Sequence, residues 1–387
     1  MERRKKPEEF SLLGGPLHWL GCHLGLVRGG TNTVALGLAL GLSSWTILLL
    51  LALIEGVSEQ VLSLSAIGGH VRLLIVIPLF FLCESLLDPR VTVFVRTLVH
   101  WEVVPRTALP VLESETARIG RWKDSWLPDV LCLLAVVLMS LIAPELSQLG
   151  TTPAYSPNRT AGGASLTGLW YWIVCLPLFR FLMLRWLWRL GLWWYFLWRV
   201  SRLELNLVPI HPDRAAGLGY LEVVHAEFAT LILAISALAS AAFAESLVAG
   251  TTHFTALYPV TALMLLIDAV MFLGPLCIFF PKLWLSRVTG LDTYMELAAH
   301  YVNDFDRKWV ETGAARREKL LGSPDVQALA DLATSMRVVS DMRLVPGSRR
   351  LLLIFTAAAL VPMLPLVLLE YPVAELIERV FKLVFNL

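Results

Sequence analysis

Charged residues are scarce in this sequence, and the motifs of several kinds of membrane protein are missing. Only 16% of its 387 residues are charged, against about 25% in an average soluble domain. The G-x-x-x-x-G-K-[ST] motif is missing, so the chain holds no ATP-driven pump of its own. The H-E-x-x-H and G-x-S-x-G motifs are missing too, which removes the commonest intramembrane proteases. No lysine occurs between Lys123 and Lys282 or in 351–370, which excludes a retinal Schiff base.

Long apolar runs are what the sequence has instead. Apolar residues make up 57% of the chain, and the mean hydropathy is +0.67. They come in blocks of about 17–25 residues, the length that a helix needs to cross about 30 Å of hydrocarbon. The sequence therefore predicts an all-α, polytopic transmembrane helix bundle of about seven spans with cytoplasmic amphipathic helices. The predicted spans are 33–54, 71–87, 127–144, 169–187, 226–248, 257–280 and 351–370.

Lysine and arginine are concentrated in alternate connections between the spans. Of the 32 such residues, 27 lie in four segments: 1–32, 88–126, 185–225 and 282–350. The connections 55–70 and 249–256 contain none. Because positively charged connections stay in the cytoplasm, we predict a cytoplasmic N-terminus and an external C-terminus. A net charge of +1 gives no electrostatic reason to expect nucleic acid as a partner.

This pattern divides the chain into four parts. We predict a cytoplasmic N-terminal segment (1–32), a six-span bundle (33–281), a cytoplasmic helical region (282–350), and a last span with an interfacial tail (351–387). Within the bundle, 88–126 is predicted to form cytoplasmic helices and 203–221 a cytoplasmic loop. The tail should include an amphipathic helix over 372–385, lying in the membrane interface.

The region 282–350 carries two amphipathic patterns. One predicted helix face holds apolar residues at spacings of three and four: Leu291, Met295, Ala298, Tyr301, Val302, Phe305 and Trp309. A second helix should open at Ser323-Pro324-Asp325, because serine caps, proline fits the first turn, and aspartate meets the positive helix end. Its apolar residues are Val326, Leu329, Ala333, Met336 and Val339. We expect these helices to dock on each other, on 88–126 or on a second subunit.

Three charges fall inside predicted spans. A carboxylate at hydrocarbon depth costs a few kcal/mol or more, so Asp268 points to a partner or a task. Arg180 and Asp268 each lie near the middle of their predicted spans, within about 5 Å of the same depth. An ion pair between them is the leading hypothesis, because neither charge is tolerable alone. Glu84 would join this cluster or pair with Arg185, and the cluster would either lock helices together or line an ion or proton path.

The other polar residues of the spans have simpler explanations. The fourth span and its extension hold seven tryptophans between Trp170 and Trp198, where Arg185, Arg189 and Arg199 are expected to reach lipid phosphate. The fifth span is rich in alanine and serine, so we expect it at the centre of the bundle, with Ser236 and Ser240 on one face that could be wet. Gly37 and Gly41 in the first span predict close helix packing.

The segment Pro209–Tyr220, PIHPDRAAGLGY, is the most distinctive string of the chain. Two prolines and two glycines favour an irregular backbone from which His211, Asp213 and Arg214 project. Asp213 would cap the helix that follows, with Arg214 meeting lipid phosphate. Alternatively, His211 and Asp213 would gate or sense something at the mouth of the bundle.

On this string the chain resembles a family of bacterial polytopic membrane proteins that share a P-x-H-P-D-R-x-x-G-L-G-x-L signature. Three further strings fit the same pattern: Trp186-Leu-Trp-Arg189, Leu321-Gly-Ser-Pro-Asp325 and Met342-Arg-Leu-Val-Pro346. The resemblance covers most of the chain and implies a bacterial inner membrane, but it implies no activity.

The sequence predicts no metal and no cofactor. Its five cysteines are scattered, with no C-x-x-C pair, which favours free thiols over disulfides. Glu222 and His225 match half of a di-metal carboxylate motif whose second copy is missing, so His225 is better placed among polar lining residues of the bundle. The predicted partners are the lipid bilayer and, as open alternatives, a second copy of the chain or a cytoplasmic protein.

Three functions remain open. The first is an ion or proton channel, or a secondary transporter, that uses Glu84, Arg180 and Asp268. The second is a membrane-embedded sensor or assembly protein that acts through its cytoplasmic helices. The third is a membrane enzyme acting on a lipid-borne substrate near His211, although an enzyme is less favoured because no catalytic set is evident.

Overall fold

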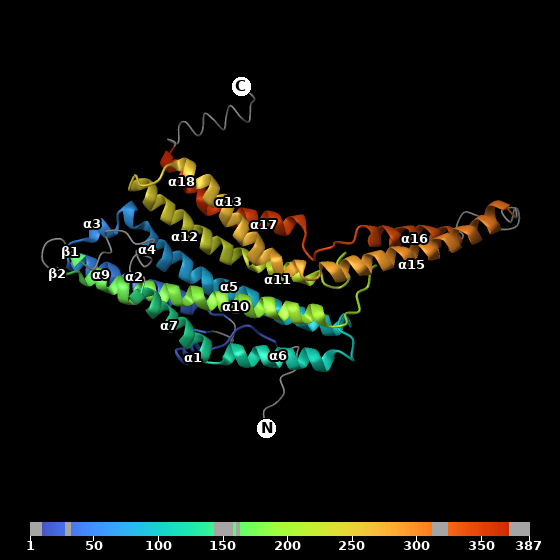
Figure 1. The fold of residues 1–387 in the computed structure, drawn as a ribbon, viewed down its shortest axis with the longest axis horizontal. Coiled ribbons are helices and arrows are strands. Elements are labelled where there is room, and N and C mark those ends of the chain that lie inside the picture. The colour runs from blue at the N-terminus through green and yellow to red at the C-terminus, as the bar shows by residue number, and fades with distance from the viewer. Residues whose placement is uncertain (1–9, 28–31, 143–157, 160–162, 312–323, 371–387) are drawn as a thin grey trace, which may run out of the picture.

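The computed structural model describes residues 10–27, 32–142, 158–159, 163–311 and 324–370 (Figure 1). It confirms the all-α prediction, since the only strands in these residues are a two-residue antiparallel pair, β1 (Asn158–Arg159) and β2 (Gly163–Ala164). The helices of the first half are α1 (Pro16–His23), α2 (Val34–Ile54), α3 (Ser58–Val61), η2 (Leu64–Ala66), α4 (Ile67–Val71), η3 (Arg72–Val76), α5 (Ile77–His100), α6 (Leu109–Asp124), α7 (Leu127–Ile142), α9 (Leu166–Trp170) and η5 (Tyr171–Cys175). Those of the second half are α10 (Leu176–Arg202), α11 (Tyr220–Glu227), α12 (Ala229–Val248), η6 (Phe254–Ala256), α13 (Leu257–Asp268), η7 (Ala269–Leu273), α14 (Gly274–Cys277), α15 (Phe280–Asp306), η8 (Arg307–Glu311), α16 (Pro324–Ser340), α17 (Arg349–Leu360), η10 (Val361–Met363) and α18 (Leu364–Glu370).

Six helical runs are long and apolar enough to cross a membrane, which confirms six of the seven predicted spans. They are Val34–Ile54, Leu64–His100, Leu166–Arg202, Tyr220–Val248, Phe254–Cys277 and Arg349–Val367. The remaining predicted span corresponds to α7, whose 16 residues reach only about 24 Å at the usual helical rise. Helices α6 and α7 are long and apolar enough to form a seventh span only if they are taken together, and the angle between them is 44°.

The second and fourth spans are much longer than predicted. Each is a continuous run of 37 residues, or about 55 Å of helix against about 30 Å of hydrocarbon. Residues 88–100 continue α5 through Pro89, so the predicted span boundary at residue 87 is not a helix end, and the cytoplasmic place of these residues stays a prediction. Asp88 at this boundary is buried and accepts hydrogen bonds, so its charge does not end the helix.

Small residues allow close packing at the centre of the bundle. A Cβ atom on Gly37 would lie 2.7 Å from Phe81, and one on Gly41 would lie 2.3 Å from the carbonyl oxygen of Leu73. Helix α2 therefore packs directly on η3 and α5, as the glycine pair predicts. The fifth span, α12, packs against α4, α5 and α17, which confirms its predicted central place. All five cysteines are free thiols, as predicted.

Helices α15 and α16 form a hairpin that extends away from the bundle (Figure 1). We call that end of the bundle the hairpin end, and the opposite end, with β1 and β2, the far end. The two helices dock on each other, which is one of the predicted alternatives. Asp325 fastens the distal part, because its backbone carbonyl accepts a hydrogen bond from the Tyr301 hydroxyl (3.0 Å) and its carboxylate accepts one from Trp309 Nε1 (3.0 Å).

Two residues of the predicted packing face do not pack. Met295 and Val302 are 49% and 40% exposed, because they lie beside the α15–α16 contact rather than within it. The predicted serine cap at position 323 and the predicted tail helix over 372–385 lie outside the described residues. Helix α16 begins at Pro324, as the predicted first turn requires.

Candidate functional site: a buried charge cluster between α5 and α10

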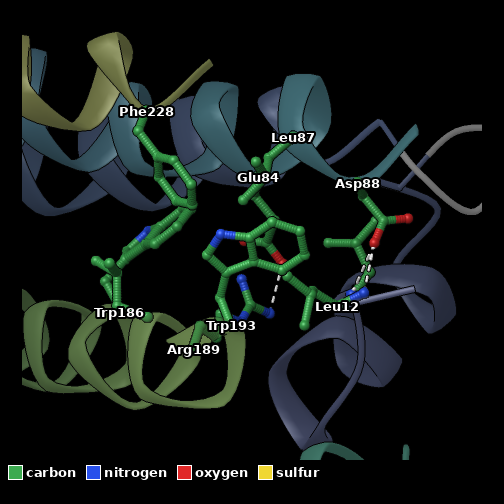
Figure 2. Close-up of a pocket in the computed structure, with 10 residues that line it drawn as sticks. Leu12, Glu84, Leu87, Asp88, Trp186, Arg189, Trp193 and Phe228 are labelled. Carbon is green, nitrogen blue, oxygen red and sulfur yellow. Dashed lines mark hydrogen bonds and ion pairs between the residues drawn. The ribbon is translucent and has the colours of Figure 1, made fainter. Parts of the chain in front are cut away.

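Two acids and two arginines face each other between α5 and α10. Glu84 and Asp88 lie one turn apart on α5, and Arg185 and Arg189 lie one turn apart on α10. Glu84 Oε1 lies 2.8 Å from Arg189 Nη2, and their side chains are only 5% and 8% exposed (Figure 2). Such a pair is tolerated away from water because each charge compensates the other.

Asp88 does not pair with an arginine. It binds the N-terminal segment of the chain. Its Oδ1 accepts hydrogen bonds from the backbone N–H groups of Leu12 (2.7 Å) and Leu13 (3.0 Å), and from the Ser11 hydroxyl (2.7 Å). Leu12 and Leu13 are both buried. The segment before α1 therefore lies across the middle of α5 and is held there by Asp88.

Arg185 fastens the same segment from the other side. Its Nη2 donates to the Gly14 carbonyl (2.8 Å), and its Nε lies 3.8 Å from Asp129 on α7. Lys123 at the end of α6 donates to the Ser11 carbonyl (3.1 Å). These contacts correct the prediction that Arg185 and Arg189 reach lipid phosphate, since both are buried in protein. Arg199 also has a protein partner, the Glu115 carboxylate of α6 at 2.6 Å.

A narrow apolar pocket surrounds the Glu84–Arg189 pair. Leu12, Leu87, Trp186, Trp193 and Phe228 line it (Figure 2). Its free space has room for about one water molecule. The pair is thus enclosed by bulky side chains, and the pocket is too narrow for a hydrated ion.

The structure does not bring Arg180 and Asp268 together, so their predicted ion pair is wrong for the described residues. Arg180 Nη1 lies 3.4 Å from Ser140 Oγ on α7. Helices α10 and α13–α14 run in the same direction and meet where Trp194 Nε1 donates to the Met271 carbonyl (3.0 Å). Arg180 lies 14 residues before Trp194 on its helix, or about 21 Å, and Asp268 lies 3 residues before Met271, or about 4.5 Å. The two charges therefore differ by about 16 Å along the helix direction. The sequence estimate counted depth from the start of each span, and it failed because the two helical runs start at different levels: Leu166 lies 28 residues before Trp194, whereas Phe254 lies 17 residues before Met271.

Asp268 ends α13 and is 5% exposed. Within the described part of the chain, its Oδ2 has no hydrogen-bond partner. It is therefore a buried carboxylate oxygen that remains unsatisfied by the surrounding helices, which is costly in an apolar setting.

The predicted polar lining residues instead hold helices together. His225 is fully buried, and its Nε2 accepts from Trp193 Nε1 (3.2 Å). Because the indole N–H can only donate, the proton of His225 is on Nδ1 and is donated to the Phe272 carbonyl (2.7 Å). The Ser236 hydroxyl donates to the Ala359 carbonyl of α17. Ser240 is buried in the same helix as Ser236, so neither serine lines an open path.

Asp213 organises the irregular loop before α11. Its carboxylate accepts the N–H groups of Ala215 (2.8 Å), Gly217 (3.1 Å) and Gly219 (2.7 Å). Burial alone would raise the pKa of Asp213, but these N–H groups and His211 lower it below its ordinary value. The predicted capping role is therefore broader than one helix end, since the carboxylate fixes the whole turn.

His211 and Arg214 are tied to neighbouring segments. His211 Nδ1 lies 2.8 Å from Asp213 Oδ1, and its ring lies 5.2 Å from that of Trp101. The Arg214 carbonyl accepts the backbone N–H of Arg343 (2.7 Å), and Arg343 pairs with Glu222 at 2.6 Å. The loop thus joins the end of α5, the start of α11 and the segment between α16 and α17.

Sequence inspection missed a second group of buried charges toward the far end. Arg72 donates to the Tyr171 hydroxyl and lies over the Phe179 ring at 6.0 Å. Glu245 on α12 accepts the backbone N–H of Gly68 at 2.7 Å. Both residues lie near the predicted span ends, where a charge is expected to reach water, so their burial had no sequence signal. Among the described residues, no group of three or more histidine, cysteine or acidic side chains could hold a metal.

Fold and site together define the class of this protein. Six to seven apolar helices, packed around buried and mostly compensated charges, make it a multi-pass integral membrane protein. Comparisons with protein-family models, with curated proteins and with solved structures gave no match in any of the three. The resemblance at 209–220 to a bacterial membrane protein family therefore stays a prediction.

Proposed function

We propose that this protein is a membrane-embedded assembly or sensor protein that presents the α15/α16 hairpin to a protein partner. The observation that carries the proposal is the hairpin itself, which leaves the bundle as a packed helix pair with exposed apolar residues (Figure 1). Exposed apolar residues beyond the membrane mark interaction sites. The buried charges of the bundle then serve to fix the helices from which the hairpin extends.

The proposal includes an orientation. The hairpin and the N-terminal segment lie in the cytoplasm of a bacterium, and the bundle lies in its inner membrane. Supporting this is the distribution of lysine and arginine, which favours the connections at the hairpin end. Labelling of single cysteines by a membrane-impermeant reagent tests the orientation: Asp341→Cys should react only after the cells are opened.

Photocrosslinking in living cells tests the function. A photoreactive amino acid at Val302, which is exposed beside the helix contact, should give a protein adduct of defined size. The same amino acid at Thr334, on the outer side of α16, is the matched control and should give none. Absence of a protein adduct from Met295, Val302 and Val326 alike would overturn the proposal.

An ion or proton pathway is the second candidate. The buried, unsatisfied Oδ2 of Asp268 favours it, because such a group suits a site that binds a cation or a proton in passing. Ion and proton flux in proteoliposomes tests it, with Asp268→Asn as the variant. Flux that this variant abolishes would establish the pathway, and absence of flux under every imposed gradient would leave the assembly function.

A further inference from the structure

The hairpin has one apolar face. The half-buried contact residues of α15 are Leu291, Tyr294, Ala298, Tyr301 and Phe305, and those of α16 are Asp325, Leu329, Leu332 and Met336. Successive residues of an α-helix are about 100° apart around its axis, so the residue after each contact residue points to one side of the hairpin. Because the two helices are antiparallel, these following residues lie on the same side of the hairpin. We call this side the Met295 face, and its exposed apolar residues are Met295, Ala299 and Val302 on α15 and Val326, Ala330 and Ala333 on α16.

The opposite side of the hairpin is mostly polar. The residues that precede the contact residues include Thr293, His300 and Asp304 on α15, and Asp331 and Ser335 on α16. Leu297 and Ala328 are the exposed apolar residues among them. The hairpin is therefore built to be covered on one side and solvated on the other.

We infer that the partner covering the Met295 face is the same face of a second copy of this chain. The inference rests on the proposed function and names its partner. Two copies inserted in one membrane share their orientation, so the two-fold axis that relates them is parallel to the membrane normal. The hairpin extends in roughly the direction of the spans (Figure 1), so the two hairpins lie side by side, with α15 of one copy opposite α16 of the other.

The register of the hairpin decides which residues meet. Within one chain, a Cβ atom on Gly290 would lie 3.2 Å from Val339, and the Tyr301 hydroxyl bonds to the Asp325 carbonyl. These two contacts place residues of α15 and α16 at the same level where their positions add to about 626–629. Rotation about a two-fold axis parallel to the membrane normal leaves each residue at the same height along that normal.

Apolar residues then oppose apolar residues across the axis. By this register Met295 faces Ala333 of the second copy, Ala299 faces Ala330, and Val302 faces Val326. Alanine lets helices approach closely, and the larger side chains fill the grooves. The Met295 face thus meets apolar side chains of its own kind across the axis.

Charge completes the match. Asp292 and Arg337 are both exposed and lie at the edge of the Met295 face. By the same register, Asp292 of each copy is opposite Arg337 of the other, which gives two ion pairs of opposite sign at the membrane-proximal part of the contact.

Disulfide crosslinking between two differently tagged copies tests the inference. The five native cysteines are first replaced by alanine or serine, and one copy carries Ala299→Cys while the other carries Ala330→Cys. Oxidation in the membrane should link the two tags in one band. Thr293→Cys with Ser335→Cys, at the same level on the opposite face, is the matched control and should give no such band.

Charge reversal tests the register. Asp292→Arg alone and Arg337→Asp alone should each lower the Ala299–Ala330 crosslink yield about fivefold. The two reversals in one chain should restore it. If the yield is unaffected by either single reversal, the proposed register is wrong.

The outcomes separate this inference from the proposed function. If no crosslink forms between the two tags but Val302 still photocrosslinks to a different protein, the second copy is excluded and the assembly function stands. If neither the disulfide crosslink nor the Val302 photocrosslink forms, the second-copy inference and the proposed function both fail. A Thr293–Ser335 crosslink equal in yield to the Ala299–Ala330 crosslink would also exclude the Met295 face as the contact.

Discussion

Glu84 and Arg189 form an ion pair at 2.8 Å between α5 and α10, and bulky apolar side chains enclose it. Breaking such a pair from one side should be far more damaging than removing both charges, because a lone buried charge has no compensation. Glu84→Gln or Arg189→Met should therefore lower the free energy of unfolding by about 3–5 kcal/mol. Thermal unfolding of the purified protein in detergent measures the loss.

The double variant Glu84→Leu with Arg189→Met removes both charges, so it should be nearly as stable as the native chain and more stable than either single variant. Glu102→Gln serves as control, because Glu102 pairs with Arg106 at 3.2 Å on an exposed surface, where a pair is worth about 0–1 kcal/mol. Equal losses for Glu84→Gln and Glu102→Gln would contradict the stabilising role of the buried pair.

Asp88 should decide whether the N-terminal segment stays in place. Asp88→Ala removes the acceptor of the Leu12 and Leu13 N–H groups. Amide hydrogen exchange at residues 11–14 should then become faster, while exchange in α10 stays slow. Asp341→Ala, at an exposed acid, is the control. Unchanged protection of residues 11–14 in Asp88→Ala would show that Arg185 and Lys123 suffice to hold the segment.

Asp213 should make the stability of the loop depend on pH. Its folded-state pKa is lowered below the ordinary value of 3.8, so its charge stabilises the fold fully above that pH, and the contribution is lost as the pH falls through the lowered pKa. Asp213→Asn lacks this contribution. The difference in melting temperature between the native chain and Asp213→Asn should be largest near neutral pH and should shrink toward pH about 3. A difference that grows on acidification would have the wrong sign.

The two glycines of the same loop should resist substitution for different reasons. Gly217 has a φ of +98°, and a Cβ atom on it would lie 2.8 Å from the Val103 side chain. A Cβ atom on Gly219 would lie 2.7 Å from the Cβ atom of Asp213. Gly217→Ala and Gly219→Ala should each lower the melting temperature, because backbone strain or a shift of the Asp213 carboxylate must follow. Gly120→Ala in α6 meets nothing within 4 Å and should be neutral or stabilising by up to about 1 kcal/mol.

The pairing of α5 with α10 was open to prediction in part. Glu84 and Asp88 are one turn apart, and so are Arg185 and Arg189, so each helix carries a stripe of one charge on one face. Two complementary stripes in apolar surroundings favour a contact between those helices. Which acid takes which arginine was not predictable, because Asp88 binds backbone N–H groups from a segment more than seventy residues earlier in the chain.

The Arg180–Asp268 hypothesis shows where such reasoning fails. Depth was counted from predicted span ends, and those ends followed hydropathy alone. Helix α10 continues to Arg202 because its outer arginines are compensated by Glu84, Asp129 and Glu115, which are remote in sequence. Counted from the Trp194–Met271 contact, the run that holds Arg180 starts about eleven residues, or about 16 Å, earlier than the run that holds Asp268.

By itself the sequence determined that this chain crosses a membrane as a helical bundle, since the length and polarity of each run suffice for that. It also determined where the backbone must turn tightly, because proline, glycine and aspartate act locally at 209–220. Only the tertiary structure decided which charges compensate one another and that the Met295 face stays open. Those outcomes depend on how far helices extend and how they are rotated, and packing between distant segments sets both.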